Sequence, residues 1–143
     1  MQANINGIGT GGVLINENGE ILLLQRVKPP EAGCWSIPGG AIEFGETAKE
    51  TVIREFHEET DLTCDVVDFL GYYDYILQKE GRHWVSLFFV MERISQNAPE
   101  NKEPKKHTDL QWFDMDNLPD KLTVNTANAI KLYKKWIKKN CQQ

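Results

Sequence analysis

Hydrophobic residues fall in short runs separated by turn signals over much of the chain, a pattern typical of strands. The runs predict strands over residues 7–16, 21–27, 65–78 (with a break near Gly71), 84–94 and 110–115. The Asn-Gly pair within residues 16–19 predicts a tight turn. Prolines and polar residues predict loops over 28–36 and 96–108 and a turn over 117–120.

Two other segments have the 3.6-residue period of an amphipathic helix. The first covers about residues 47–60 and opens with Thr47-x-x-Glu50, which is a capping-box pattern. The second covers about residues 126–139 and places an apolar stripe opposite its lysines. Strands, a helix, further strands and a helix in this order predict an α+β domain. Because no linker or repeat divides the chain, we expect a single domain over residues 1–143.

Composition narrows the class of protein. Hydrophobic residues make up 41% and charged residues 26% of the chain, which is ordinary for a globular domain with one core. No apolar run approaches the roughly 20 residues of a membrane-spanning helix, and the N-terminus lacks the pattern of a secretory signal. The three cysteines are widely spaced, as expected for free thiols in a reducing compartment. We therefore expect a cytoplasmic protein without a membrane partner.

The charge is acidic and uneven. The formal net charge is −5, from 16 Lys and Arg against 21 Asp and Glu. Such a balance disfavours binding along a nucleic-acid polymer. Residues 131–143 hold five lysines and no acid, so the acidic groups are concentrated in the rest of the chain.

Part of this acid lies on one side of the first helix. At about 100° per residue, Glu55, Glu58 and Glu59 fall within an arc of about 100°. Carboxylates four residues apart repel each other, and the C-terminal half of a helix disfavours anions. A divalent cation, Mg²⁺ or Mn²⁺, would relieve both effects because it prefers hard oxygen ligands. A solvated acidic face is the ordinary alternative for three glutamates alone, and the flanking residues decide between the two.

The segment 40–62 resembles the Nudix box. The family pattern is G, five residues, E, seven residues, then R-E-U-x-E-E-x-G-U, where U is a bulky apolar residue. The chain has the fixed residues of this pattern at Gly40, Glu46, Arg54, Glu55, Glu58 and Glu59, with Phe56 and Leu62 at apolar positions.

Asp61 stands where the Nudix box has glycine. That position ends the helix, where a left-handed residue is common. Because Asp tolerates this conformation better than most residues, we expect a cost of about 1 kcal/mol or less and an intact fold.

The resemblance implies an α/β/α sandwich around a mixed sheet and hydrolysis of a nucleoside diphosphate linked to a further group. It implies a Mg²⁺ cofactor, with Mn²⁺ as the alternative, held by the Gly40 carbonyl, Glu55, Glu58 and Glu59. Arg54 is expected to orient a carboxylate of the box rather than to contact phosphate. The general base is left open among Glu58, Glu59 and Glu46, with Glu103 as a further candidate. Homodimers are common in the family, and the sequence leaves the oligomeric state open.

The region after the box is similar to the MutT-type branch, which implies a nucleoside triphosphate substrate and release of pyrophosphate. This similarity is carried by residues 81–89, 103–106 and 110–113. Hydrolysis of ADP-ribose or a nucleotide sugar is the alternative activity. A non-catalytic nucleotide-binding domain is a third reading, which the presence of all three helix glutamates disfavours.

Four residues are candidates for substrate binding: Arg26, Arg82, Trp84 and Asn125. Each has a structural alternative. Arg26 also suits a surface strand end, and Arg82 a solvated hairpin. Trp84 suits packing against the sheet, and Asn125 suits a helix N-cap.

Overall fold

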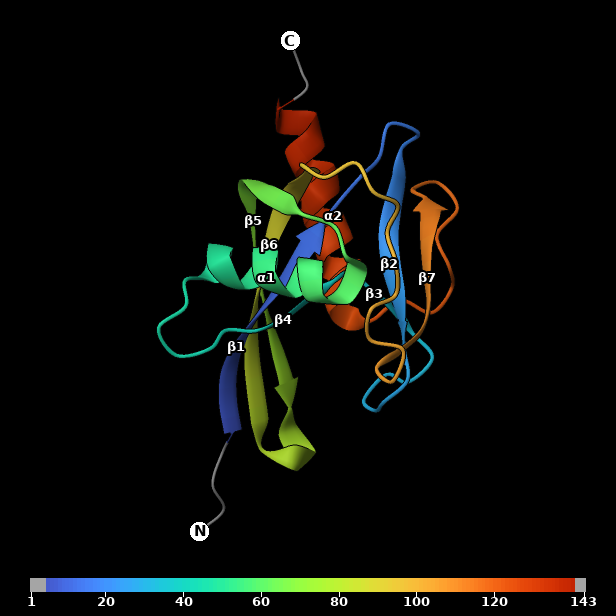
Figure 1. Ribbon diagram of the computed structural model, residues 1–143. Coiled ribbons are helices and arrows are strands. Elements are labelled where there is room, and N and C mark those ends of the chain that lie inside the picture. The colour runs from blue at the N-terminus through green and yellow to red at the C-terminus, as the bar shows by residue number, and fades with distance from the viewer. Residues whose placement is uncertain (1–4, 141–143) are drawn as a thin grey trace.

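A computed structural model describes residues 5–140 and shows two sheets flanked by two long helices (Figure 1). The elements in chain order are β1 (Ile5–Val13), β2 (Glu20–Arg26), β3 (Trp35–Ser36), β4 (Gly39–Ala41), α1 (Ala48–Thr60), β5 (Cys64–Leu77), the 3₁₀ helix η1 (Gln78–Glu80), β6 (Arg82–Arg93), β7 (His107–Asp114) and α2 (Val124–Asn140). No helix among residues 5–140 combines the length and apolar character needed to cross a bilayer.

The expected mixed sheet is divided into two. A four-stranded sheet has the order β4-β1-β6-β5, and it is mixed because β1 and β6 run parallel while the other pairs are antiparallel. A three-stranded antiparallel sheet has the order β3-β2-β7. The predicted turn at Asn16–Gly19 is present, with Gly19 at φ 76°. It leads the chain from one sheet into the other, since β2 pairs with β3 and β7. The segment after β1 contacts β2 through the bridge between Ile15 and Ile21 and a hydrogen bond from the Leu22 N–H to the Leu14 carbonyl.

The two helices bury separate apolar clusters. Neighbouring residues of a strand point to opposite faces, so Phe88 joins the cluster under α2 while Phe89 joins the cluster under α1. The side chain of Phe56 fixes α1 in its cluster, and Ala129 and Ile130 fix α2 in the other. The chain thus has the expected α+β fold with helices on both sides of the sheets.

The ends of α1 follow the sequence prediction. The Thr47 hydroxyl accepts the Glu50 N–H at 3.1 Å, and the Glu50 carboxylate accepts the Thr47 N–H at 3.0 Å, which completes the capping box. Asp61 ends the helix at φ 66°, in the left-handed region. Its carbonyl accepts a hydrogen bond from the Asn97 side chain at 2.9 Å, so the departure from glycine leaves the helix end intact.

The short strands were not predicted. Residues 35–36, expected in a loop, form β3 against β2, and residues 39–41 form β4 against β1. Two- and three-residue strands carry too few positions for a period-two pattern to be recognised. β5 continues through Gly71, where its pairing with β6 shifts register instead of ending.

Candidate active site

Two glycines bring the backbone of β4 into contact with its neighbours. A Cβ atom on Gly39 would overlap the Thr10 carbonyl of β1, and one on Gly40 would overlap the Glu55 carboxylate of α1. The Gly40 carbonyl accepts a hydrogen bond from the Thr10 hydroxyl at 3.0 Å.

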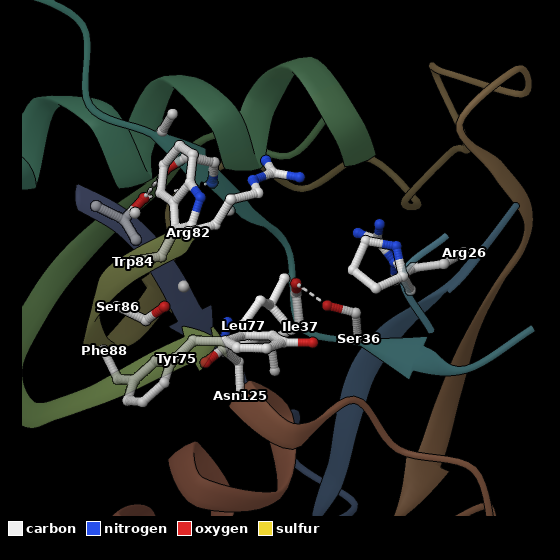
Figure 2. Close-up of a pocket in the computed structure, with 17 residues that line it drawn as sticks. Arg26, Ser36, Ile37, Tyr75, Leu77, Arg82, Trp84, Ser86, Phe88 and Asn125 are labelled. Carbon is white, nitrogen blue, oxygen red and sulfur yellow. Dashed lines mark hydrogen bonds between the residues drawn. The ribbon is translucent and has the colours of Figure 1, made fainter. Parts of the chain in front are cut away.

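A cavity of about 310 Å³ borders these glycines (Figure 2). All four predicted substrate-binding residues line it, although they come from β2, β6 and α2: Arg26, Arg82, Trp84 and Asn125. Its size is at the lower end of the range for small-molecule sites. Trp84 and Tyr75, which are paired across β6 and β5, both line the cavity.

Two polar atoms of this cavity have no hydrogen-bond partner among the residues that the structure describes. Arg82 Nε and Asn125 Oδ1 are buried without a hydrogen bond, which is costly in a folded protein unless a ligand or water pairs with them. The alternative N-cap role of Asn125 is wrong, because the Thr123 hydroxyl accepts the Thr126 N–H at 3.2 Å and caps α2. The Asn125 amide is therefore not used by the helix end.

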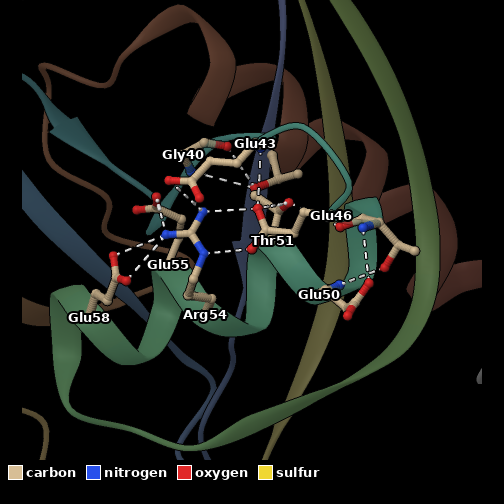
Figure 3. A network of polar contacts seen from close by, with 10 residues as sticks. Gly40, Glu43, Glu46, Glu50, Thr51, Arg54, Glu55 and Glu58 are labelled. Atoms are coloured by element: carbon tan, nitrogen blue, oxygen red, sulfur yellow. Dashed lines mark hydrogen bonds and ion pairs between the residues drawn. The ribbon is translucent and has the colours of Figure 1, made fainter.

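Arg54 gathers the carboxylates of the box around one guanidinium (Figure 3). Its Nε and Nη2 donate to the two oxygens of Glu46 at 2.6 and 3.0 Å. Its Nη1 donates to Glu55 at 3.0 Å and to Glu58 at 3.2 Å. This pairing, together with a hydrogen bond from the Thr51 hydroxyl, lowers the pKa of Glu46 to about 2. In this arrangement Arg54 contacts three carboxylates of the box.

Glu59 has a different environment. It is 6% exposed, and its Oε1 accepts the Gly39 N–H at 3.1 Å. No ion pair reaches it within residues 5–140. Burial raises the pKa of Glu59 well above its usual value, and the nearby Glu55 carboxylate raises it further. Burial also raises the pKa of Glu55. A carboxylate that is buried in this way is stabilised either by pairing with a cation or by taking up a proton.

The donor set fits a hard divalent cation. A Cβ atom on Gly40 would meet the Glu55 carboxylate, and Glu59 accepts the N–H of the preceding Gly39, so two carboxylates lie beside the Gly39–Gly40 backbone. Within the part of the chain that the structure describes, no three acidic, His or Cys side chains already converge on one point. Glu58 pairs with Arg54 instead.

Sequence reasoning missed Tyr75 and Glu31. The Tyr75 hydroxyl donates to Glu31 Oε1 at 2.9 Å, and Glu31 Oε2 accepts the Val124 N–H at 2.8 Å. Burial and the Glu31 carboxylate raise the pKa of Tyr75 to about 12. Glu31 thus joins the 28–36 loop to β5 and to the start of α2 at the edge of the cavity. Contacts across 44 and 93 residues leave no local signal in the sequence.

Comparison with known proteins gives one consistent family. The NUDIX domain family model matches residues 6–135. An ADP-ribose pyrophosphatase of Methanocaldococcus jannaschii is 35% identical over 123 residues, covering 86% of this chain and 70% of that protein. The 8-oxo-dGDP phosphatase of mouse is 29% identical over 134 residues, covering 92% of this chain but only 38% of its own length.

The solved structures agree with this result. A MutT NUDIX hydrolase from Burkholderia pseudomallei superposes with a TM-score of 0.80 at 33% identity, covering 89% of this chain and 97% of that one. The fold and the box together define a hydrolase built on an α/β/α sandwich. The chain belongs to the Nudix family of hydrolases.

Proposed function

We propose that this Nudix hydrolase cleaves a pyrophosphate bond in nucleoside triphosphates, NTP or dNTP, and releases the monophosphate and pyrophosphate. The observation that carries the proposal is the position of the cavity beside the Gly39–Gly40 backbone, which leads directly to Glu55 and Glu59. A nucleoside held in the cavity has its phosphates at the carboxylates of α1. The NUDIX match over residues 6–135 supports one catalytic domain, which we propose spans residues 1–143. We further propose that it acts on small nucleotides in the cytoplasm.

The cofactor in this proposal is Mg²⁺, with Mn²⁺ as a substitute. The Gly40 carbonyl, Glu55 and Glu59 would hold it, with Glu58 joining when it leaves Arg54. A bound divalent cation neutralises phosphate oxygens and lowers the pKa of a water molecule. The local positive charge would also offset the repulsion between an acidic protein and a polyanionic substrate.

The other side chains of the Nudix box have different roles in the proposed reaction. Both oxygens of Glu46 are engaged by Arg54, so its role is to position that arginine, which in turn orients Glu55 and Glu58. Glu58, Glu59 and Glu103 remain the candidates for the base that accepts a proton from the attacking water. Glu58 is more exposed than Glu59.

The cavity supplies groups suited to a nucleoside. Aromatic faces such as those of Trp84 and Tyr75 stack on bases without strong sequence preference. The unpaired Arg82 Nε and Asn125 Oδ1 offer one donor and one acceptor to a base edge or ribose. Arg26, at the other end of the cavity, is placed to meet a phosphate.

ADP-ribose, or another nucleotide sugar, is the second candidate substrate. It is favoured by the name of the M. jannaschii relative, an ADP-ribose pyrophosphatase that is 35% identical. The proposed metal centre would serve either substrate, because both contain a phosphoanhydride bond.

A substrate panel with Mg²⁺ tests the proposal. The purified protein is given NTPs, dNTPs, oxidised nucleotides, ADP-ribose and nucleotide sugars, and the products are separated by chromatography. We expect pyrophosphate and a monophosphate from triphosphates, and loss of this turnover in Glu59→Gln. Glu17→Gln, which alters an exposed carboxylate in the turn before β2, is the matched control and should retain activity. Cleavage confined to ADP-ribose or nucleotide sugars, or full Mg²⁺-dependent turnover by Glu59→Gln, would refute the proposal.

A further inference from the structure

A second cleft, of about 200 Å³, lies beside the nucleoside cavity. It is lined by Arg26, Lys28, Glu59, Lys106 and His107. Arg26 borders both hollows, and Figure 2 shows it apart from Trp84 and Arg82, at the opposite end of the first cavity. The two spaces therefore meet at Arg26.

The cleft carries positive charge that the protein does not neutralise. Arg26 directs Nε and Nη2 to the backbone carbonyls of Pro30 and Lys28, at 3.2 and 3.3 Å, and these bonds leave its charge unpaired. Within residues 5–140, no carboxylate pairs with the Lys28 ammonium group. Lys106 shares its charge with Glu103 at 3.3 Å. Of the three cations, Arg26 and Lys28 therefore have no ion pair among residues 5–140, while Glu103 offsets Lys106 and the Glu59 carboxylate also lines the cleft.

A buried polar atom also points to a ligand. His107, the first residue of β7, is 8% exposed and lines the cleft, and its Nδ1 has no hydrogen-bond partner within residues 5–140. Backbone pairing places it opposite Arg26 on β2. Buried polar groups in native proteins are almost always paired. An anion in the cleft would give the imidazole an acceptor and the three cations a counter-charge.

We infer that this cleft binds the pyrophosphate half of the substrate, the β- and γ-phosphates of a nucleoside triphosphate. The inference rests on the proposed function and assigns Lys28, Lys106 and His107 to its leaving group. Glu59 lines the cleft and accepts a hydrogen bond from Gly39, which lines the first cavity. The phosphoanhydride bond that is cleaved therefore lies between the cavity and the cleft. With its scissile bond in the same place, ADP-ribose would put one phosphate and a ribose in this cleft, whereas a triphosphate puts two phosphates there. The cleft therefore favours triphosphates.

The test measures binding of inorganic pyrophosphate by isothermal titration calorimetry in Mg²⁺ buffer, next to steady-state kinetics. The variants are Lys28→Met and Lys106→Met, which keep an unbranched apolar side chain and remove the charge. Lys105→Met is the matched control, because this exposed neighbour lies outside the cleft. Removing a single positive charge about 4 Å from a phosphate in solvent lowers the affinity for that phosphate about fivefold. We expect each cleft variant to weaken pyrophosphate binding about fivefold and to raise KM for triphosphates, with a smaller rise in KM for ADP-ribose.

Equal pyrophosphate affinities for the wild type, both cleft variants and Lys105→Met would overturn the inference, even where triphosphate turnover is present. An equal rise in KM for ADP-ribose and triphosphates would also overturn it. If pyrophosphate binding depends on Lys28 and Lys106 but no triphosphate is cleaved, the anion subsite is supported and the proposed function fails. The calorimetric result and the substrate panel thus separate the two conclusions.

Discussion

Replacing Glu59 by glutamine should stabilise the metal-free protein while it removes activity. The carboxylate is 6% exposed and has one hydrogen bond, from the Gly39 N–H at 3.1 Å. A glutamine side chain has nearly the same shape and keeps an oxygen that accepts this bond. The substitution therefore removes a buried charge with little change in packing.

The expected gain follows from three contributions. Moving a carboxylate into the protein interior costs several kcal/mol, and a hydrogen bond to the charged acceptor returns about 1.5–3 kcal/mol. The neutral amide avoids the first cost and keeps a hydrogen bond worth about 1 kcal/mol. Its NH₂ group loses about 1 kcal/mol where it lacks an acceptor. The balance is a gain of about 1–3 kcal/mol in the free energy of unfolding, or about 3–10 °C in Tm for a chain of this size.

Thermal and guanidinium unfolding, followed by circular dichroism in EDTA and in Mg²⁺, measure this effect. The wild type should gain stability when Mg²⁺ is added, because a ligand that binds only the native state stabilises it. Glu59→Gln should be more stable than the wild type in EDTA and should gain much less from Mg²⁺. Glu58→Gln, which removes a more exposed carboxylate paired with Arg54, is the control and should show no rise in EDTA. A Glu59→Gln protein that is less stable than the wild type in EDTA would refute the reasoning.

Three further outcomes are expected. Asp61→Ala should be less stable than Asp61→Gly by about 1 kcal/mol in urea unfolding, because residue 61 is left-handed at φ 66°; equal stabilities would contradict this account. Glu31→Ala removes the hydrogen bonds to Tyr75 and Val124, so it should cost about 1–2 kcal/mol and raise KM for the nucleotide more than it lowers kcat; Glu31→Gln should recover part of both effects. Burial lowers the pKa of His107 below its usual 6.5, so the unfolded chain takes up the proton first and native stability should fall as pH drops below about 6.5. Urea unfolding at pH 7.5 and 5.5 measures this loss, which should be smaller in His107→Gln.

The elements predicted best from sequence are those with strong local signals. α1 was placed to within one residue at its start because the capping box between Thr47 and Glu50 is a local pattern. The same holds for the end of the helix at Asp61. The division into two sheets was not predictable in this way. It depends on β2 pairing with β7 across more than 80 residues, a choice made by tertiary packing.

In the candidate site, too, local features were predictable from the sequence and long-range contacts were not. Glu55, Glu58 and Glu59 were recognisable because they lie within two turns of one helix. The contacts that give these three glutamates different environments were not recognisable from the sequence. Burial of Glu59 depends on Gly39, 20 residues away, and on the sheets that cover α1. The cavity depends on strand register, which places Tyr75 beside Trp84.

The acidic groups of the box therefore fall into two electrostatic classes with different consequences. Arg54 forms ion pairs with Glu46, Glu55 and Glu58, so one guanidinium offsets part of their combined charge within the protein. Glu59 has no such compensation, and it lines the same cleft as the unneutralised charge of Arg26. A monovalent anion would satisfy the cations and repel Glu59, and a free cation would do the reverse. A divalent metal bound to pyrophosphate presents both charges at once, so the cleft is suited to that complex more than to either of its parts.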